Sequence, residues 1–139
     1  MTAAQQNHAG SCLCSRIRYT VTGPLGLTIN CHCTDCRRSH AADFATLVEI
    51  PWSAFRFTQG EDQLTTYTTE SGTKRSFCRH CGSILTVWSE ADKTMLEIAP
   101  STLDTPVDVR VDHHIYVRSR APWYTIRDDR PQHQTVKDA

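Results

Sequence analysis

The sequence predicts a mainly β domain of moderate size, and three observations support this fold class. Short stretches rich in β-branched and aromatic residues recur along the chain, with turn residues between them. Few segments place apolar residues at the three- and four-residue spacing of a helix. The length of 139 residues suits one ordinary domain. We therefore predict mostly antiparallel strands and little helix.

The predicted elements follow the chain in order. Residues 16–21 alternate apolar and polar side chains and form the first predicted strand, and residues 23–26 form a turn. Residues 27–30 are predicted to be extended. Further strands are predicted at residues 44–50, 55–58, 64–69, 74–78, 83–88, 95–99 and 114–117. A short helix is predicted over residues 34–42 and a helical turn over residues 101–104.

Composition and charge exclude several classes of partner. Fifteen basic residues balance fifteen acidic ones, so the chain lacks the basic excess of a general nucleic-acid binder. No apolar run approaches the roughly 18–20 residues of a membrane span. The first ten residues are polar and do not resemble a secretory signal. We expect a cytoplasmic protein with no nucleic-acid or membrane partner, and the oligomeric state stays open.

Seven cysteines dominate the chemistry that this chain can offer. Their odd number excludes complete pairing as disulfides within one chain, and disulfides are rare in a reducing compartment. Short spacings of two or three residues let thiolates converge on one metal ion. The three groups are Cys12 and Cys14; Cys31, Cys33 and Cys36; and Cys78 and Cys81. We predict zinc, because an iron–sulfur cluster with four cysteines would leave three over.

Seven ligands divide naturally into four and three. The two distant pairs could close on one structural zinc, and Gly82 after Cys81 suits a tight turn whose N–H groups point at sulfur. The central group could hold a second zinc with an open coordination position. Spacing alone leaves other pairings open, for example Cys12 and Cys14 with the central group. Nearby arginines would offset the negative charge of the thiolates, and they are Arg37, Arg38, Arg75 and Arg79.

Three cysteine motifs also carry a resemblance to a known family. They are GSCLC over residues 10–14, CHCTDCRR over residues 31–38 and FCRHCGS over residues 77–83, with HIYV at 114–117 and APW at 121–123. In these motifs the sequence resembles the glutathione-dependent formaldehyde-activating family, which also includes the centromere protein V domain. The resemblance implies a β-tent fold of antiparallel sheets pinned by a structural zinc. It spans about residues 10–131 as a single domain, with a loose tail at 1–9 and a C-terminal tail at 132–139.

The resemblance also implies roles for the cysteines. It places the structural zinc on Cys12, Cys14, Cys78 and Cys81, and the catalytic zinc on Cys31, Cys33 and Cys36. The second site can be empty in the isolated protein. The implied function is a carbon–sulfur lyase that acts on glutathione or a thiol adduct of an aldehyde, similar to S-(hydroxymethyl)glutathione synthase.

Other residues near the open site receive interpretations of their own. Arg37 or Arg38 could bind a glutathione carboxylate, and His40 stands where the family usually has a small residue, so we expect it to tune the site. Asp35 is expected to cap the helix. His32 is assigned no role, and of the pair at 113–114 one histidine is expected to pack and one to face solvent.

Two other functions compete with the lyase. A non-catalytic, zinc-stabilised β-tent binding module needs no open zinc site. A redox enzyme on the same fold would need a reactive cysteine free of zinc, and the family pattern leaves none.

Overall fold

A computed structural model describes residues 6–136 and confirms the mainly β fold class. Within these residues, α1 is the one α-helix. Most described strand pairs are antiparallel, and β3 pairs with β10 in parallel. The chain forms two compact units, which we describe separately. The first comprises the residues up to Gly26 and Val48–Asp108, and the second comprises Leu27–Leu47 and the chain from Val109 onward.

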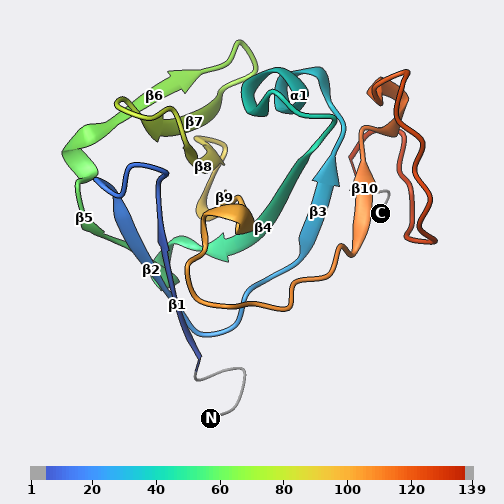
Figure 1. The fold of residues 1–139 in the computed structure, drawn as a ribbon. Coiled ribbons are helices and arrows are strands. Elements are labelled where there is room, and N and C mark those ends of the chain that lie inside the picture. The colour runs from blue at the N-terminus through green and yellow to red at the C-terminus, as the bar shows by residue number, and fades with distance from the viewer. Residues whose placement is uncertain (1–5, 137–139) are drawn as a thin grey trace. The chain divides into compact units, whose positions relative to one another are not determined.

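The first unit contains a three-stranded antiparallel sheet in the order β1-β2-β5 (Figure 1). Its strands are β1 (Asn7–Ser11), β2 (Arg18–Thr22) and β5 (Phe55–Gln59). Tyr19 and Val21 are buried on β2 while Arg18 and Thr22 are exposed, which is the alternation that predicted this strand. β1 was not predicted, and it begins inside the segment expected to be a loose tail.

A close contact explains why Gly10 and Tyr19 occur together. Gly10 lies opposite Tyr19 across the β1–β2 pair, and a Cβ atom at Gly10 would lie 2.2 Å from the tyrosine ring. Only glycine leaves room for this ring. The hydroxyl of Tyr19 is 2.6 Å from Oγ1 of Thr102, and burial raises the pKa of Tyr19 to about 12. The pair therefore fixes β1 against β2 around a buried side chain.

The remaining strands of the first unit form an antiparallel sheet in the order β4-β9-β8-β7-β6. They are β6 (Leu64–Thr68), β7 (Thr73–Cys78), β8 (Ile84–Ser89) and β9 (Asp92–Ile98), together with the part of β4 (Ala45–Pro51) that lies in this unit. β7 and β8 form the hairpin predicted around the last cysteine pair. The 3-10 turns η2 (Trp52–Ala54), η3 (Glu61–Gln63) and η4 (Pro100–Thr102) connect strands. Buried side chains such as Leu85, Leu96 and Ile98 form its core.

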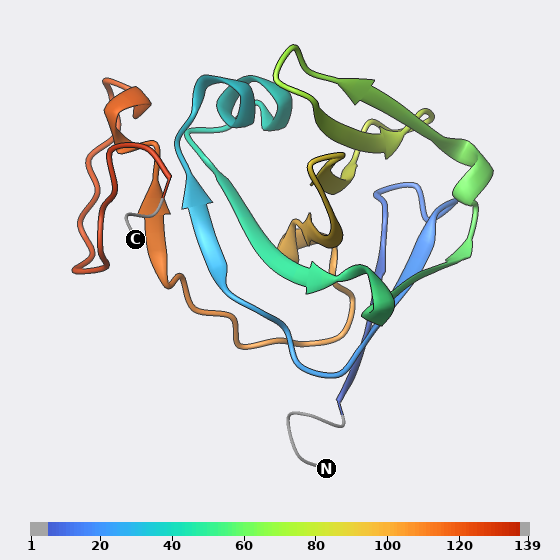
Figure 2. The same cartoon turned by 180° about the vertical axis from the view of Figure 1, so that it is seen from behind.

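The second unit is built around β3 (Thr28–Cys31), all four residues of which are buried. β3 pairs in parallel with β10 (His113–Ile115), and the start of β4 lies on its other side. The helix α1 (Thr34–His40) follows β3 before the chain turns back into β4, as the view from behind shows (Figure 2). The 3-10 turn η5 (Val117–Ser119) follows β10.

The chain beyond residue 131 continues to contact β10. His114 donates its backbone N–H to Pro131, and His133 donates its own to His114. The predicted boundaries at residues 10 and 131 stay predictions, although the described hydrogen bonds extend beyond both. Among the described residues, no helix combines the length and the apolar character that crossing a bilayer requires.

Candidate metal centres

Four cysteines of the first unit converge on one point. The Sγ atoms of Cys12, Cys14, Cys78 and Cys81 all lie within 4.8 Å of one another. The sulfurs of Cys12 and Cys14 are 3.6 Å apart, and those of Cys14 and Cys78 are 3.7 Å apart. A tetrahedral zinc with Zn–S bonds of about 2.3 Å separates its sulfurs by about 3.8 Å. The set therefore fits a closed zinc site.

Two tight turns bring these sulfurs together. In the turn after β7, Gly82 has φ +80° and donates its N–H to the carbonyl of Cys78, while His80 donates to the Cys78 sulfur at 3.4 Å. In the turn after β1, the N–H of Ile17 points at the Cys12 sulfur at 3.4 Å. The left-handed backbone at Gly82 is the conformation that glycine adopts at little cost. The glycine after the last cysteine thus shapes the turn as the sequence predicted.

The electrostatics of this cluster include an arginine that sequence reasoning missed. Hydrogen bonds from the backbone and the guanidinium of Arg16 lower the pKa of Cys14, and the Cys14 sulfur raises the pKa of Arg16 in return. Burial raises the pKa of Cys12 to about 11. Burial acts in the same direction on Cys81, but hydrogen bonds from Ser83, from the Cys14 backbone and from Cys78 together outweigh it and lower the pKa of Cys81 to about 5. Arg79, which we interpret from the sequence as a solvated surface residue, is exposed and donates from its guanidinium to Gln63.

Three cysteines of the second unit form the other cluster. The sulfurs of Cys31, Cys33 and Cys36 also lie within 4.8 Å of one another, and two of these residues are buried. Cys31 ends β3, Cys33 precedes α1, and Cys36 lies in its first turn. The side-chain interactions with Cys33 and Cys36, followed by burial, raise the pKa of Cys31. Three converging sulfurs fit a zinc that keeps one coordination position open.

The helix that carries this cluster is capped by sulfur. Cys33 is the N-cap residue, and its Sγ accepts the backbone N–H of Cys36 at 3.2 Å. The expectation that Asp35 caps the helix is therefore wrong: Asp35 lies inside the first turn and is exposed. The backbone of Cys33 is extended, which is the usual conformation of an N-cap residue. The N-cap is therefore the last extended residue before α1.

Arg37, Arg38 and His40 differ in their surroundings. Arg37 donates to the carbonyl of Ser119 at 3.0 Å and lies over the ring of Trp123, so it holds the segment after β10. Arg38 is exposed. His40 is half-buried, its Nε2 is shielded from solvent, and it lies one helical turn after Cys36.

A buried chain of imidazoles adjoins the three-cysteine cluster in sequence, and sequence reasoning missed it. His32, to which we assigned no role, is fully buried, and its Nε2 is 2.9 Å from Nδ1 of His114. Nε2 of His114 lies 3.0 Å from a carboxylate oxygen of Asp128. His113 is also buried, so the expectation that one histidine of this pair faces solvent is wrong. Burial, followed by the charges of His114 and Arg120, lowers the pKa of His32 to about 4.

The carboxylate fixes one proton of this chain: Asp128 can only accept, so Nε2 of His114 carries a proton. We assign Nδ1 of His114 as the acceptor and Nε2 of His32 as the donor, because the opposite assignment would place an unpaired N–H at the buried Nδ1 of His32. That Nδ1 is buried with no hydrogen-bond partner among the described residues. The network thus holds His32, and with it the turn between Cys31 and Cys33, in one orientation.

Replacing His114 should loosen this turn. In His114→Phe the buried N–H of His32 loses its acceptor, which costs about 1–3 kcal/mol of unfolding free energy. Thermal or denaturant unfolding measures this loss. ¹⁵N NMR of the parent protein shows which ring nitrogens of His32 and His114 are protonated. We expect protonated Nε2 and bare Nδ1 in both rings at neutral pH. A doubly protonated His114, or unchanged stability in the variant, would contradict this assignment.

The chain is mainly β and carries one cluster of four cysteines and one of three. It therefore belongs to the class of small cysteine-rich domains whose ligands suit one closed and one open zinc site. The family model described as glutathione-dependent formaldehyde-activating enzyme matches residues 7–119, and the chain belongs to this family. This range contains all seven cysteines.

One solved structure supports the fold independently. The crystal structure of a Rhodobacter sphaeroides protein matches this chain with a TM-score of 0.60 and 23% sequence identity. The match covers 71% of this chain and 90% of that chain. At this identity the likeness concerns the fold.

Proposed function

We propose that the protein is a zinc-dependent carbon–sulfur lyase that forms and cleaves adducts between glutathione, or a related thiol, and an aldehyde. Family membership supports the chemistry. The observation that carries the proposal is the cluster of Cys31, Cys33 and Cys36, which is one ligand short of a closed tetrahedral site. In this reaction the thiol sulfur forms a bond to the carbonyl carbon, and the thiol proton ends on the former carbonyl oxygen.

The two clusters would divide the metal chemistry. Cys12, Cys14, Cys78 and Cys81 would hold a structural zinc, and Cys31, Cys33 and Cys36 a catalytic one. A zinc ion at the open site supplies a Lewis acid that lowers the pKa of a bound thiol or polarises a carbonyl. The three thiolates would attach this zinc to the end of β3 and the start of α1.

The residues after Cys36 would position the substrate. Arg38 is exposed on α1, and a guanidinium binds a carboxylate through two parallel hydrogen bonds. We assign glutathione binding to Arg38 rather than Arg37, because Arg37 is already engaged with Ser119 and Trp123. His40, one turn beyond Cys36, can accept the thiol proton and limit the size of the aldehyde. This would favour a substrate other than formaldehyde itself.

Among the described residues, none of the seven cysteines forms a disulfide, which suits a reducing compartment. We also propose that the protein acts in the cytoplasm on a small thiol adduct. The balance of fifteen basic and fifteen acidic residues supports the proposal that it has no nucleic-acid partner, and we propose no membrane partner.

The role of Arg38 can be tested by comparing two thiols. Arg38→Ala in the zinc-loaded protein should raise KM about tenfold for the glutathione adduct of an aldehyde, since a hydrogen bond to a charged group contributes about 1.5–3 kcal/mol. The adduct of 2-mercaptoethanol, which has no carboxylate, should show no change. Arg79→Ala, an exposed arginine bonded to Gln63, is the control.

The outcomes separate the residue assignment from the function. An equal loss for both thiols would contradict the carboxylate role of Arg38. If the zinc-loaded parent cleaves no adduct of either thiol, the lyase proposal is wrong, and the non-catalytic binding module becomes the better account.

A further inference from the structure

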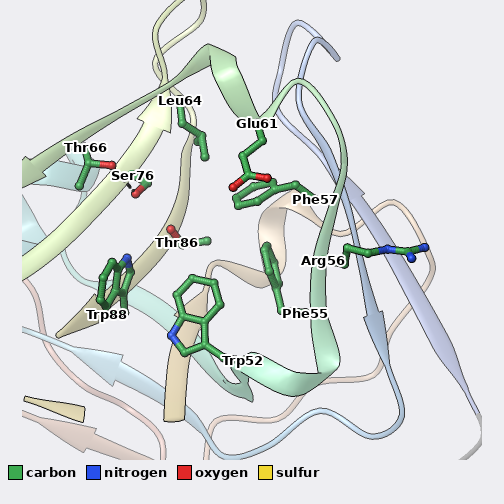
Figure 3. Close-up of a pocket in the computed structure, with 10 residues that line it drawn as sticks. All are labelled: Trp52, Phe55, Arg56, Phe57, Glu61, Leu64, Thr66, Ser76, Thr86 and Trp88. Carbon is green, nitrogen blue, oxygen red and sulfur yellow. Dashed lines mark hydrogen bonds between the residues drawn. The ribbon is translucent and has the colours of Figure 1, made fainter. Parts of the chain in front are cut away.

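A pocket of about 380 Å³ lies in the first unit, and none of the residues that line it belongs to either cysteine cluster (Figure 3). Small-molecule sites in proteins have volumes of about 300–1,000 Å³. The side chains that line it come from η2, β5, η3 and the β6-β7-β8 sheet. Four of them are large aromatic residues, namely Trp52, Phe55, Phe57 and Trp88.

Neighbouring rings of this pocket are nearly perpendicular to one another. Trp52 lies edge-on to Trp88, with ring centres 5.6 Å apart and planes at 89°. Trp52 and Phe55 are 5.8 Å apart at 85°. Phe55 and Phe57 are 4.9 Å apart, also at 85°. Phe55 also stacks on Tyr19, with ring centres 5.1 Å apart, so one of its faces is covered. The remaining ring surfaces border one space from several directions, and the face of an aromatic ring attracts cations.

The charged groups around the pocket favour a cation as well. The carboxylate of Glu61 points into the space beside Phe57, whereas the guanidinium of Arg56 points away from it (Figure 3). Among the described ion pairs, none involves Glu61. The pocket therefore combines aromatic rings with one exposed carboxylate that forms none of the described ion pairs.

One ring of the pocket, Trp88, already interacts with a cation of this chain. The ammonium of Lys74 lies 5.8 Å from the centre of this ring and is held by the hydroxyl of Thr68 and by Glu90. Because Lys74 already lies over the ring of Trp88, we place the ligand against the three other rings and Glu61. The opposite wall carries the hydroxyls of Thr66 and Ser76, which are 2.9 Å apart.

We propose that this pocket binds a small organic cation with an alkylated ammonium group, seated against Trp52, Phe55 and Phe57 with Glu61 as its counter-ion. An alkylated ammonium keeps its positive charge while presenting methyl groups to the rings, so it loses less hydration than a bare ammonium. The hydroxyls of Thr66 and Ser76 can bind a polar substituent of the same ligand.

Choline and its neutral isostere 3,3-dimethyl-1-butanol provide a direct test. Titration of the zinc-loaded chain by calorimetry should show choline binding about two- to thirtyfold more tightly than the neutral alcohol, given a cation–π contribution of about 0.5–2 kcal/mol. In ¹H NMR the choline methyl signal should move upfield under the ring currents. Glu61→Gln should weaken choline binding about three- to fivefold. Asp62→Asn, the exposed neighbour in η3, should leave it unchanged.

Two results would overturn the proposal. Equal affinity for choline and the neutral alcohol would make the pocket an apolar site without cation selectivity. Absence of both heat and an upfield shift with choline would mean that the cation does not enter it. Trp52→Leu, checked for folding by circular dichroism, should abolish the shift in a protein that remains folded, and a retained shift would place the ligand elsewhere.

Discussion

Cys81→Ser is expected to lose most of its folded, soluble protein, whereas Cys33→Ser should fold like the parent. Cys81 is one of four sulfurs that join the turn after β1 to the turn after β7, residues far apart in the sequence. Structural zinc binds zinc-finger peptides with about 10–16 kcal/mol, as much as the whole stability of a typical domain, about 5–15 kcal/mol. Loss of one thiolate should therefore lower the unfolding free energy by several kcal/mol.

The two variants form a matched pair. Both cysteines are half-buried, and both substitutions replace sulfur by a hydroxyl. Serine at position 33 can still cap α1, because its hydroxyl accepts the N–H of Cys36 that the sulfur accepts now. Soluble yield and the midpoint of thermal unfolding measure the difference. Equal midpoints for both variants and the parent would show that the four-cysteine cluster does not stabilise the fold.

Cys33→Ser is also expected to abolish turnover. This follows from the proposed function, because the open site would keep only two thiolates. Loss of a residue that merely supports a metal ligand costs about 10–100-fold in affinity or activity, so loss of a ligand itself should reduce kcat/KM to below about one hundredth. The measurement is turnover of the glutathione adduct at fixed zinc, together with zinc bound per chain.

Thr34→Ala is the control, since Thr34 is exposed at the start of the same helix. It should keep parental kcat/KM and zinc content. If Cys33→Ser retained full turnover, the three-cysteine cluster would not be the catalytic site.

β2 and β1 show what a local sequence pattern can and cannot predict. β2 alternates exposed and buried side chains, and its pattern is readable without tertiary information. β1 contains no large apolar residue, and its sequence NHAGS reads as a loop. Its order comes from pairing with β2 and from the contact between Gly10 and the Tyr19 ring, neither of which a local pattern contains.

The same distinction applies to the candidate site. The cysteine spacings predicted the three-cysteine cluster and the two separate pairs, because short turns place neighbouring thiols together whatever the rest of the chain does. Spacing left open which groups share an ion, because the fold brings the two distant pairs together. The hydrogen bonds from His32 to His114 and from His114 to Asp128 join residues that the fold alone brings together. Whether Cys33 or Asp35 caps the helix depends on the residue at which the helix begins. The sequence pattern cannot locate that boundary to a single residue.

Stepwise removal of zinc tests most directly the central claim that two clusters hold two metals with separate tasks. A chelator is added to the zinc-loaded protein while released zinc, turnover and circular dichroism are followed together. We expect one equivalent to leave first, with complete loss of turnover and an unchanged spectrum, because three protein ligands hold it less firmly than four. The second equivalent should leave with unfolding. Release of both equivalents in one step, or turnover that survives loss of the first, would contradict the account.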